Sequence, residues 1–459
     1  MPNATAAPAS DQTATAAVPA TKSVCASDLA ADTDAPETDA PESDAPESSA
    51  PGTAPRGTGK AAPLAVGVRR ALGRRLLPLQ VGIFLQGVGF WVPIEKLFMT
   101  EIGFDAATIG IMAAAYAALV PLVEVVSGVL ADRWSRRGVL MTACVAMLVS
   151  VLIGGFSHNV ITYIAAALIL GIYFAMYSGT VEAIVYDTVL EETGGSDAYE
   201  RQIGRIRSIE AVALVLSALA GGWIAGATST RLTYFLTVPF IVVSLIVLSR
   251  FREPRLHETS ERSPLWEHLR TTYGAIVHRG RLIPIAAAAI MSAMIVQAVF
   301  EFGPLWLIAL SASAVLYGPF WAGLVSTLGL GGLLAGRLRL DRPITVVAVV
   351  IVMLAACFTL TTSHNLLVVT IAMILLTLLV LVAGIHVSKL MHDAVPSTIR
   401  TGVASGISAV SWMLFLPFAL GFGAVSKQSG VYVSGWMFTA ATALAGAALL
   451  WVVLRPVRK

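Results

Sequence analysis

Charged residues are scarce in this chain of 459 residues, where Asp, Glu, Lys and Arg together account for 13%. A soluble globular protein contains about 25% of these four residues. Hydrophobic residues account for 56% of the chain, and its mean hydropathy is +0.77. This balance indicates an integral membrane protein.

Motifs for covalent and metal chemistry are also missing. The three cysteines, Cys25, Cys144 and Cys357, have neither disulfide nor metal-site spacing. The sequence has no phosphate-binding Gly-Lys loop, which argues against transport driven by ATP. It has no His-rich pattern that would bind a metal. We therefore predict no enzyme activity, no cofactor and no metal site.

Residues 1–68 lack aromatic side chains and are rich in Ala, Pro, Ser, Thr and Asp. The tetrapeptide DAPE occurs there three times, at 34–37, 39–42 and 44–47. Such a segment buries too little apolar area to offset its ordering entropy. It has no apolar run typical of a signal peptide. We predict a disordered cytoplasmic tail, which is acidic and so does not bind nucleic acid.

The remaining chain contains apolar runs long enough to cross a bilayer, which takes about 20 helical residues. Twelve such runs are predicted, at 77–98, 107–130, 139–156, 160–183, 207–227, 232–250, 282–302, 313–336, 344–361, 366–388, 400–424 and 431–454. The polar stretch 251–281 separates six runs from six. We therefore predict an all-α membrane protein with two six-helix bundles, 69–250 and 282–459, joined by a cytoplasmic central loop at 251–281.

Basic residues predict the orientation of these spans, because cytoplasmic loops carry an excess of Lys and Arg. With both termini in the cytoplasm, the outer loops keep only Lys96, Arg231 and Lys427 of the 31 basic residues. We therefore predict a multi-pass protein of the plasma membrane with both termini cytoplasmic.

Short motifs in the first half of the chain recur in the second half, separated by a nearly constant number of residues. The tripeptide SHN at 157–159 recurs at 363–365, and YDTV at 186–189 parallels HDAV at 392–395. Glu95 corresponds to Glu301, and GVLADR at 128–133 corresponds to GLLAGR at 332–337. Parallel six-span halves are typical of transporters that place a substrate between two rocking bundles.

The turn between the second and third spans resembles the signature of the major facilitator superfamily, G-x-L-A-D-R-x-G-R-R/K-x-x-L. The matching residues are Gly128, Leu130, Ala131, Asp132, Arg133, Arg136, Arg137 and Leu140. Ser135 stands where the family usually has Gly. With twelve spans, the resemblance covers residues 70–459 and implies the major facilitator fold.

The resemblance also implies a conformational latch at this turn, built from the signature residues Gly128, Asp132, Arg133, Arg136 and Arg137. In the family the Asp holds the second span against the eleventh and stabilises the outward-open state. The Arg is linked to an acidic residue at the end of the fourth span, for which Glu182 and Asp187 both qualify by spacing.

The stretches EVVSGVLAD at 124–132 and SGTVEAIVYD at 178–187 are similar to a bacterial subgroup described as drug-exporter-like. Ser217, Ala218, Gly221 and Gly222 match the second part of a fifth-span motif of proton antiporters, without its Pro. In the second half, Gly336 replaces the signature Asp, so we expect the latch in one half only.

Ionisable side chains inside spans are costly and mark functional sites by default. Glu95 and Glu301, at equivalent places in the first and seventh spans, are therefore our candidates for proton coupling. Amphipathic side chains in spans are candidates for orienting a substrate, against the simpler alternative of helix packing. They are Gln86, Tyr116, Tyr173, Tyr177, Gln297, His386 and Trp412.

These features together predict a secondary transporter that exports a small amphipathic compound by alternating access, driven by an ion gradient, for which we favour protons. Its partners are the substrate, the coupling ion and the lipid bilayer, and we expect a monomer. An importer of a neutral or cationic nutrient is one alternative. A non-transporting receptor or scaffold built on the same fold is the other.

Overall fold

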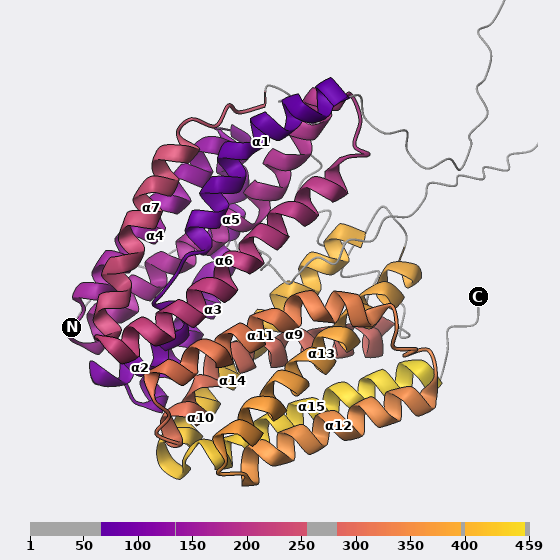
Figure 1. Cartoon of the computed structure of the whole chain (residues 1–459). Coiled ribbons are helices and arrows are strands. Elements are labelled where there is room, and N and C mark those ends of the chain that lie inside the picture. The colour runs from indigo at the N-terminus through magenta and orange to yellow at the C-terminus, as the bar shows by residue number, and fades with distance from the viewer. Residues whose placement is uncertain (1–65, 134, 255–281, 396–399, 455–459) are drawn as a thin grey trace, which may run out of the picture.

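The computed structural model describes residues 66–133, 135–254, 282–395 and 400–454. Every regular element in these ranges is helical (Figure 1). Twelve segments among the described residues are long and apolar enough to cross a membrane. The prediction of twelve membrane-spanning helices in an all-α fold is therefore confirmed. The predicted tail, up to residue 65, and residues 255–281 of the predicted central loop lie outside the described residues.

The amino-terminal bundle contains the first six spans. They are α1 (Val66–Gly87) continued by η1 (Val92–Ile94) and α2 (Glu95–Glu101), α3 (Ala106–Arg133), α4 (Arg136–Phe156), α5 (Val160–Thr193), α6 (Tyr199–Ala227) and α7 (Thr230–Leu248).

The carboxy-terminal bundle contains the other six. They are α9 (Leu282–Phe302) continued by α10 (Pro304–Ala309), α11 (Ala314–Ala335), α12 (Pro343–Thr362), α13 (Leu366–Ala394), α14 (Arg400–Ser429) and α15 (Val431–Leu454).

Equivalent helix starts explain part of the sequence repeat. Asn159 caps α5, because its side chain accepts a hydrogen bond from Thr162 N at 3.0 Å. Asn365 caps α13 in the same way, accepting from Val368 N at 3.2 Å. Asn is a strong N-cap because its carbonyl satisfies an N–H that has no partner within the helix. The two SHN tripeptides therefore begin the fourth and tenth spans.

The first and seventh spans are both broken in corresponding places. Helix α1 ends at Gly87, and the span resumes with η1 and α2. Helix α9 gives way to α10 after Gly303. Pro93 and Pro304 each occupy the beginning of the second segment, where a missing N–H costs nothing. The breaks place Glu95 at the start of α2 and Glu301 near the end of α9.

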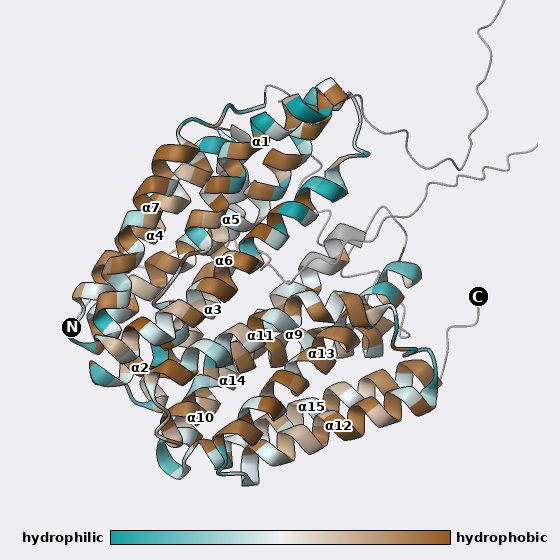
Figure 2. Ribbon diagram, in the orientation of Figure 1, coloured by the Kyte–Doolittle hydropathy of each residue, from teal (hydrophilic) through white to brown (hydrophobic). Residues whose placement is uncertain are grey.

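The sides of the bundles are apolar along most of their length, whereas hydrophilic residues gather at the helix ends (Figure 2). Large apolar side chains remain exposed along these sides, including Leu216, Trp223, Ile351 and Leu444. Such a band is expected where lipid tails replace water as the solvent.

The two bundles meet at one end of the molecule and diverge toward the other (Figure 1). Helix α3 packs against α14, and α6 packs against α11. At the meeting end, a Cβ atom on Gly423 would lie 2.6 Å from Ala106 O, and one on Gly222 would lie 2.6 Å from Gly318 N. Glycine at these positions allows the backbones to approach closely. We call the end that contains α2 and α10 the closed end, and the opposite one the open end.

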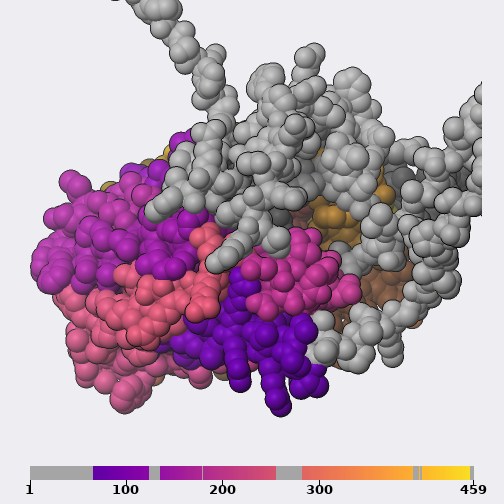
Figure 3. All heavy atoms as spheres, turned by 90° about the horizontal axis from the view of Figure 1, so that it is seen from above, coloured from indigo at the N-terminus to yellow at the C-terminus, as the bar shows by residue number. Residues whose placement is uncertain are grey.

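At the open end, the beginning of α1 lies beside the α5–α6 connection, which Figure 3 shows from above. Arg75 of α1 forms ion pairs there with Glu191 at 2.9 Å and Glu192 at 2.7 Å, both on α5. These bonds stay within the amino-terminal bundle.

Candidate functional site

Lys96 forms an ion pair that joins the two bundles at the closed end. Its Nζ lies 2.5 Å from Glu301 Oε1 on α9 and 3.3 Å from Glu95 Oε2 on the same helix, α2. Only 2% of the Lys96 side chain is exposed, against 17% and 19% for the two carboxylates. The ammonium group of Lys96 is thus held between Glu95 and Glu301, and we call these three residues the charge triad.

Tyrosines hold Glu95 within the amino-terminal bundle. The Tyr163 hydroxyl donates to Glu95 Oε1 at 3.1 Å and lies 2.7 Å from the Tyr234 hydroxyl. The Tyr234 ring stacks on Trp91, with ring centroids 5.3 Å apart. Glu95 is therefore bonded to α5, whereas Glu301 belongs to the other bundle.

Aromatic rings face each other between the bundles near the middle of the spans. Tyr116 of α3 and Trp412 of α14 have ring centroids 6.0 Å apart. Tyr116 lies ten residues after the start of α3, roughly 15 Å along its axis. Tyr116 lies within the range at which the charges of Glu95 and Glu301 act on its hydroxyl. This pair of rings therefore lies close to the charge triad, at the depth where transporters of this architecture bind substrate.

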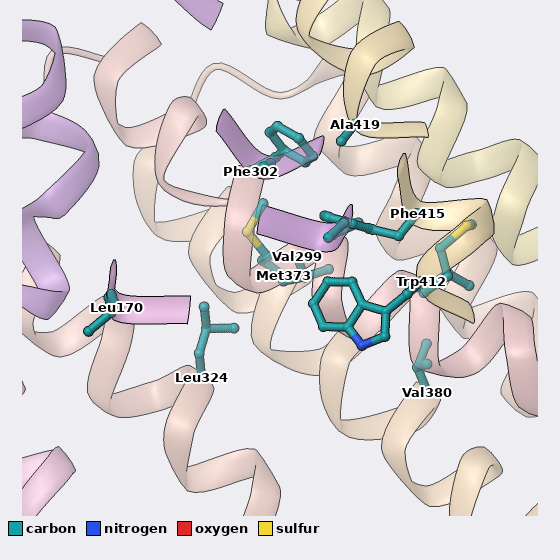
Figure 4. Packing of buried hydrophobic residues seen from close by; sticks show 14 of the residues in the cluster. Leu170, Val299, Phe302, Leu324, Met373, Val380, Trp412, Phe415 and Ala419 are labelled. Carbon is teal, nitrogen blue, oxygen red and sulfur yellow. The ribbon is translucent and has the colours of Figure 1, made fainter. Parts of the chain in front are cut away.

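Trp412 belongs to the core of the carboxy-terminal bundle as well. Its ring lies 5.7 Å from that of Phe415. Phe415 in turn lies 6.3 Å from Phe302 of α9, and Figure 4 shows the Trp412 ring among the buried apolar side chains of this core. Trp412 is 6% exposed, so its packing in the core fixes the ring that faces Tyr116.

The other predicted cavity residues occupy three different environments. Gln86 and Tyr173 lie inside the amino-terminal bundle, where Gln86 bonds to Ser244 and to the Tyr173 hydroxyl at 3.3 Å each. Tyr177 is buried one helical turn after Tyr173 on α5, and its hydroxyl donates to Glu210 at 3.2 Å. Gln297 of α9 and His386 of α13 are half-buried.

Arg136, in the predicted latch, pairs with Asp187 near the end of α5 and also donates to Ala183 O at 3.1 Å. Glu182 instead pairs with Arg207 of α6 at 3.0 Å. Of the two acids that spacing allowed as partners of Arg136, the structure therefore pairs Asp187 with it and not Glu182. Helix α3 includes Gly128, Asp132 and Arg133, but their side-chain contacts lie outside the described residues.

A second carboxylate, that of Glu253, lies at the N-terminus of α4. Glu253, which follows α7, accepts from Arg136 N at 2.6 Å and from the Ser135 hydroxyl at 2.5 Å. Arg137 donates to Ser249 O at the end of α7. A helix N-terminus favours a negative charge. Ser135, the departure from the signature, therefore serves both as the cap of α4 and as a contact to Glu253.

A surface ion pair also crosses the closed end. Lys427 Nζ of α14 lies 2.8 Å from Asp105 Oδ2, just before α3, with 58% and 42% of the two side chains exposed. The hydrogen bond from Lys427, with that from Thr108 N, lowers the pKa of Asp105 from 3.8 to about 2. The pair therefore stabilises the closed end above pH 4 and weakens only as the pH falls toward 2.

Asp105→Asn should consequently leave the pH dependence of the conformation between pH 5 and 8 unchanged. Asn keeps the cap of α3, and an exposed pair contributes less than about 1 kcal/mol. Distances between spin labels on the two bundles, measured across this pH range, check the result. A variant that loses its response to pH would show that Asp105 sets this response.

Sequence reasoning did not predict the role of Lys96. We counted this residue with the outer loops, but it is among the most buried polar side chains described. The signal was present, since Lys96 directly follows a carboxylate inside a predicted span. Tyr163 and Tyr234 gave no comparable signal, because single tyrosines in apolar runs are common.

Comparisons with known proteins agree with this architecture. The model of the Major Facilitator Superfamily matches residues 76–421. No curated protein matches the sequence. The structure is similar to the nucleoside transporter NupG, with 14% identity over 83% of this chain and 99% of that one, and a TM-score of 0.66.

Two further solved structures share the fold. A D-xylose-proton symporter has 14% identity over 85% of this chain and 96% of that one, with a TM-score of 0.62. A bacterial homologue of the human lysosomal transporter Spinster, inward-facing and occupied, has 13% identity over 85% of this chain and 95% of that one, with a TM-score of 0.60. Identities this low show the fold alone. With the family match over most of the chain, they lead to one conclusion: this protein belongs to the Major Facilitator Superfamily.

Proposed function

We propose that this protein is a secondary transporter that couples the movement of a small amphipathic compound to protons. One observation carries the proposal: the buried Lys96 joins the bundles through Glu301 while Glu95 holds it from its own helix. An ion pair across the moving interface can be opened by a single proton. The charge triad therefore has the position and the chemistry of a coupling site.

We place the open end in the cytoplasm, because it carries most of the basic residues outside the tail. They include Arg70, Arg74, Arg137, Arg201, Arg205, Arg337, Arg339 and Arg342. The structure then corresponds to an inward-open state. Among the described residues, the ion pairs between bundles, Lys96–Glu301 and Asp105–Lys427, lie at the closed end.

The proton acts on Glu301 in this scheme. Ionised Glu301 attracts Lys96 and keeps the outer end closed. Protonated Glu301 loses this attraction, so the outer end opens and the bundles close on the cytoplasmic side. Lys96 keeps Glu95 as a partner, so the loss is smaller than the roughly 3–5 kcal/mol for a buried charge left alone, but about 1.4 kcal/mol is already a tenfold shift in a two-state equilibrium.

The substrate class follows from the rings beside the charge triad. Tyr116 and Trp412 offer flat apolar faces, and Glu301 offers a negative charge near one of them. Aromatic faces and a carboxylate suit an amphipathic compound, including a cationic one. We propose export as the direction, on the resemblance to the drug-exporter-like subgroup. The D-xylose-proton symporter has the same fold, which supports proton coupling.

A flux measurement tests the proposal. The purified protein is screened for compounds that raise its melting temperature, and the best ligand is followed in proteoliposomes with an imposed pH gradient. We expect transport against the ligand's concentration gradient, opposite to the flow of protons. Movement in the same direction as protons would make the protein an importer. Binding without flux in any gradient would support a receptor or scaffold instead.

A further inference from the structure

A small cavity lies inside the amino-terminal bundle beside Glu95. Its volume is about 10 Å³, which is close to the space that one water molecule needs. Its lining combines aromatic, hydroxyl and carboxylate groups with small apolar residues. These are Trp91, Glu95, Ser150, Tyr163, Ala167 and Tyr234, among others.

Trp91 lines this cavity, and its indole carries a hydrogen-bond donor that nothing satisfies in the described part of the chain. Its side chain is 6% exposed, and its indole Nε1 is buried without a partner there. A buried donor that lacks an acceptor is costly, so native proteins pair such groups with protein or with ordered water. The ring itself is fixed by stacking on Tyr234.

Glu95 supplies acceptor capacity on the same cavity. Its Oε1 accepts from Tyr163 at 3.1 Å, and its Oε2 lies 3.3 Å from Lys96 Nζ. An ionised carboxylate has about four lone-pair positions. These two neighbours therefore leave room for another donor.

We infer that this cavity binds one water molecule, which accepts a hydrogen bond from Trp91 Nε1–H and donates one to the Glu95 carboxylate. The site selects water over a metal cation. An indole N–H presents the positive end of its dipole, and the Lys96 ammonium already lies against Glu95. Both groups repel a cation, whereas a water molecule can turn its oxygen toward the indole.

The bound water gives the two carboxylates of the charge triad different tasks. Glu95 is anchored in its own bundle by Tyr163 and by the water, so it keeps Lys96 when the bundles separate. Glu301 is the partner that leaves. This consequence rests on the proposed function, but the water site rests only on the cavity and its polar groups.

A double-mutant cycle on stability tests the water site without any transport assay. Ala167→Val fills the cavity from its apolar side, and Trp91→Phe removes the indole donor while keeping a ring. If a water is bound, Ala167→Val expels it and should lower the melting temperature by roughly 2–4 °C. In the Trp91→Phe background the same substitution should lower it by about half as much.

Equal shifts in the two backgrounds would overturn the inference. So would a raised melting temperature for Ala167→Val alone, which is how an empty apolar cavity responds to filling. The cycle subtracts the part of the steric cost of the added methyl groups that the two backgrounds share.

A second measurement covers the case in which a variant does not fold. A high-resolution structure of the unmodified protein should show solvent density within hydrogen-bond distance of Trp91 Nε1, and an empty cavity there would overturn the inference. Exchanging Na⁺ for K⁺ should leave the melting temperature unchanged. A rise specific to Na⁺ would replace the water with a cation.

Discussion

Replacing Glu301 with Gln is expected to abolish transport driven by a pH gradient while leaving the protein folded and in the membrane. Gln still accepts a hydrogen bond from Lys96, and Glu95 still neutralises the ammonium group, so no buried charge is left alone. The variant cannot take up a proton at this position. Uphill flux in proteoliposomes should therefore fall to background, whereas exchange of labelled for unlabelled substrate should continue.

The matched control is Glu101→Gln, the same change at the end of α2, the helix that carries Lys96 and Glu95. Glu101 is exposed and bonds to Thr230, outside the charge triad. It should keep uphill flux. Glu301→Asp should retain part of the coupling, because it keeps the titratable group on a shorter side chain. Wild-type uphill rates in Glu301→Gln would refute the role that we assign to this residue.

Gly423→Val is expected to drive the protein out of the observed conformation. A Cβ atom at this position would lie 2.6 Å from Ala106 O and 3.0 Å from Gly110 Cα, both backbone atoms of the opposite bundle. Backbone cannot rotate away as a side chain can, so the closed end has to separate. Overpacking of this kind costs about 1–3 kcal/mol, which corresponds to a roughly 5- to 150-fold change in the ratio of the two states.

Spin labels at Glu200 and Asp341, exposed residues at the open ends of the two bundles, report this shift. Their separation should shorten in Gly423→Val, and transport should slow because one state of the cycle is disfavoured. Gly332→Val is the control, since a Cβ atom on Gly332 has no neighbour within 4 Å. An unchanged distance distribution in Gly423→Val would show that the closed end tolerates the side chain.

Hydropathy and charge predicted the twelve spans and the all-α fold, because the bilayer imposes length and apolarity on each helix separately. The acid that pairs with Arg136 could not be predicted in this way. Glu182 and Asp187 both lie near the end of α5, five residues apart, and five residues turn a helix by roughly 500°. They therefore point to different neighbours, Glu182 to α6 and Asp187 to α4.

Lys96 is buried because the first span is broken, and no periodicity in the sequence predicted this break. An unbroken first span ending near residue 98 brings Lys96 to the interface, where a solvated side chain is the natural expectation. The chain instead leaves α1 at Gly87 and begins α2 at Glu95. This turn directs Lys96 into the protein. The relative position of the bundles also has no local signal, since it depends on contacts between residues far apart in the sequence.

The charge triad breaks the symmetry between the halves of the chain. Glu95 has its counterpart in Glu301, but Phe302 stands at the position that corresponds to Lys96. Two carboxylates and one ammonium group carry a net charge of −1 when all are ionised. A net charge inside a membrane protein is costly, and one added proton removes it. We therefore expect a stoichiometry of one proton for each transport cycle. An exact repeat of the first half would contain a second ammonium group and would leave no net charge for a proton to remove.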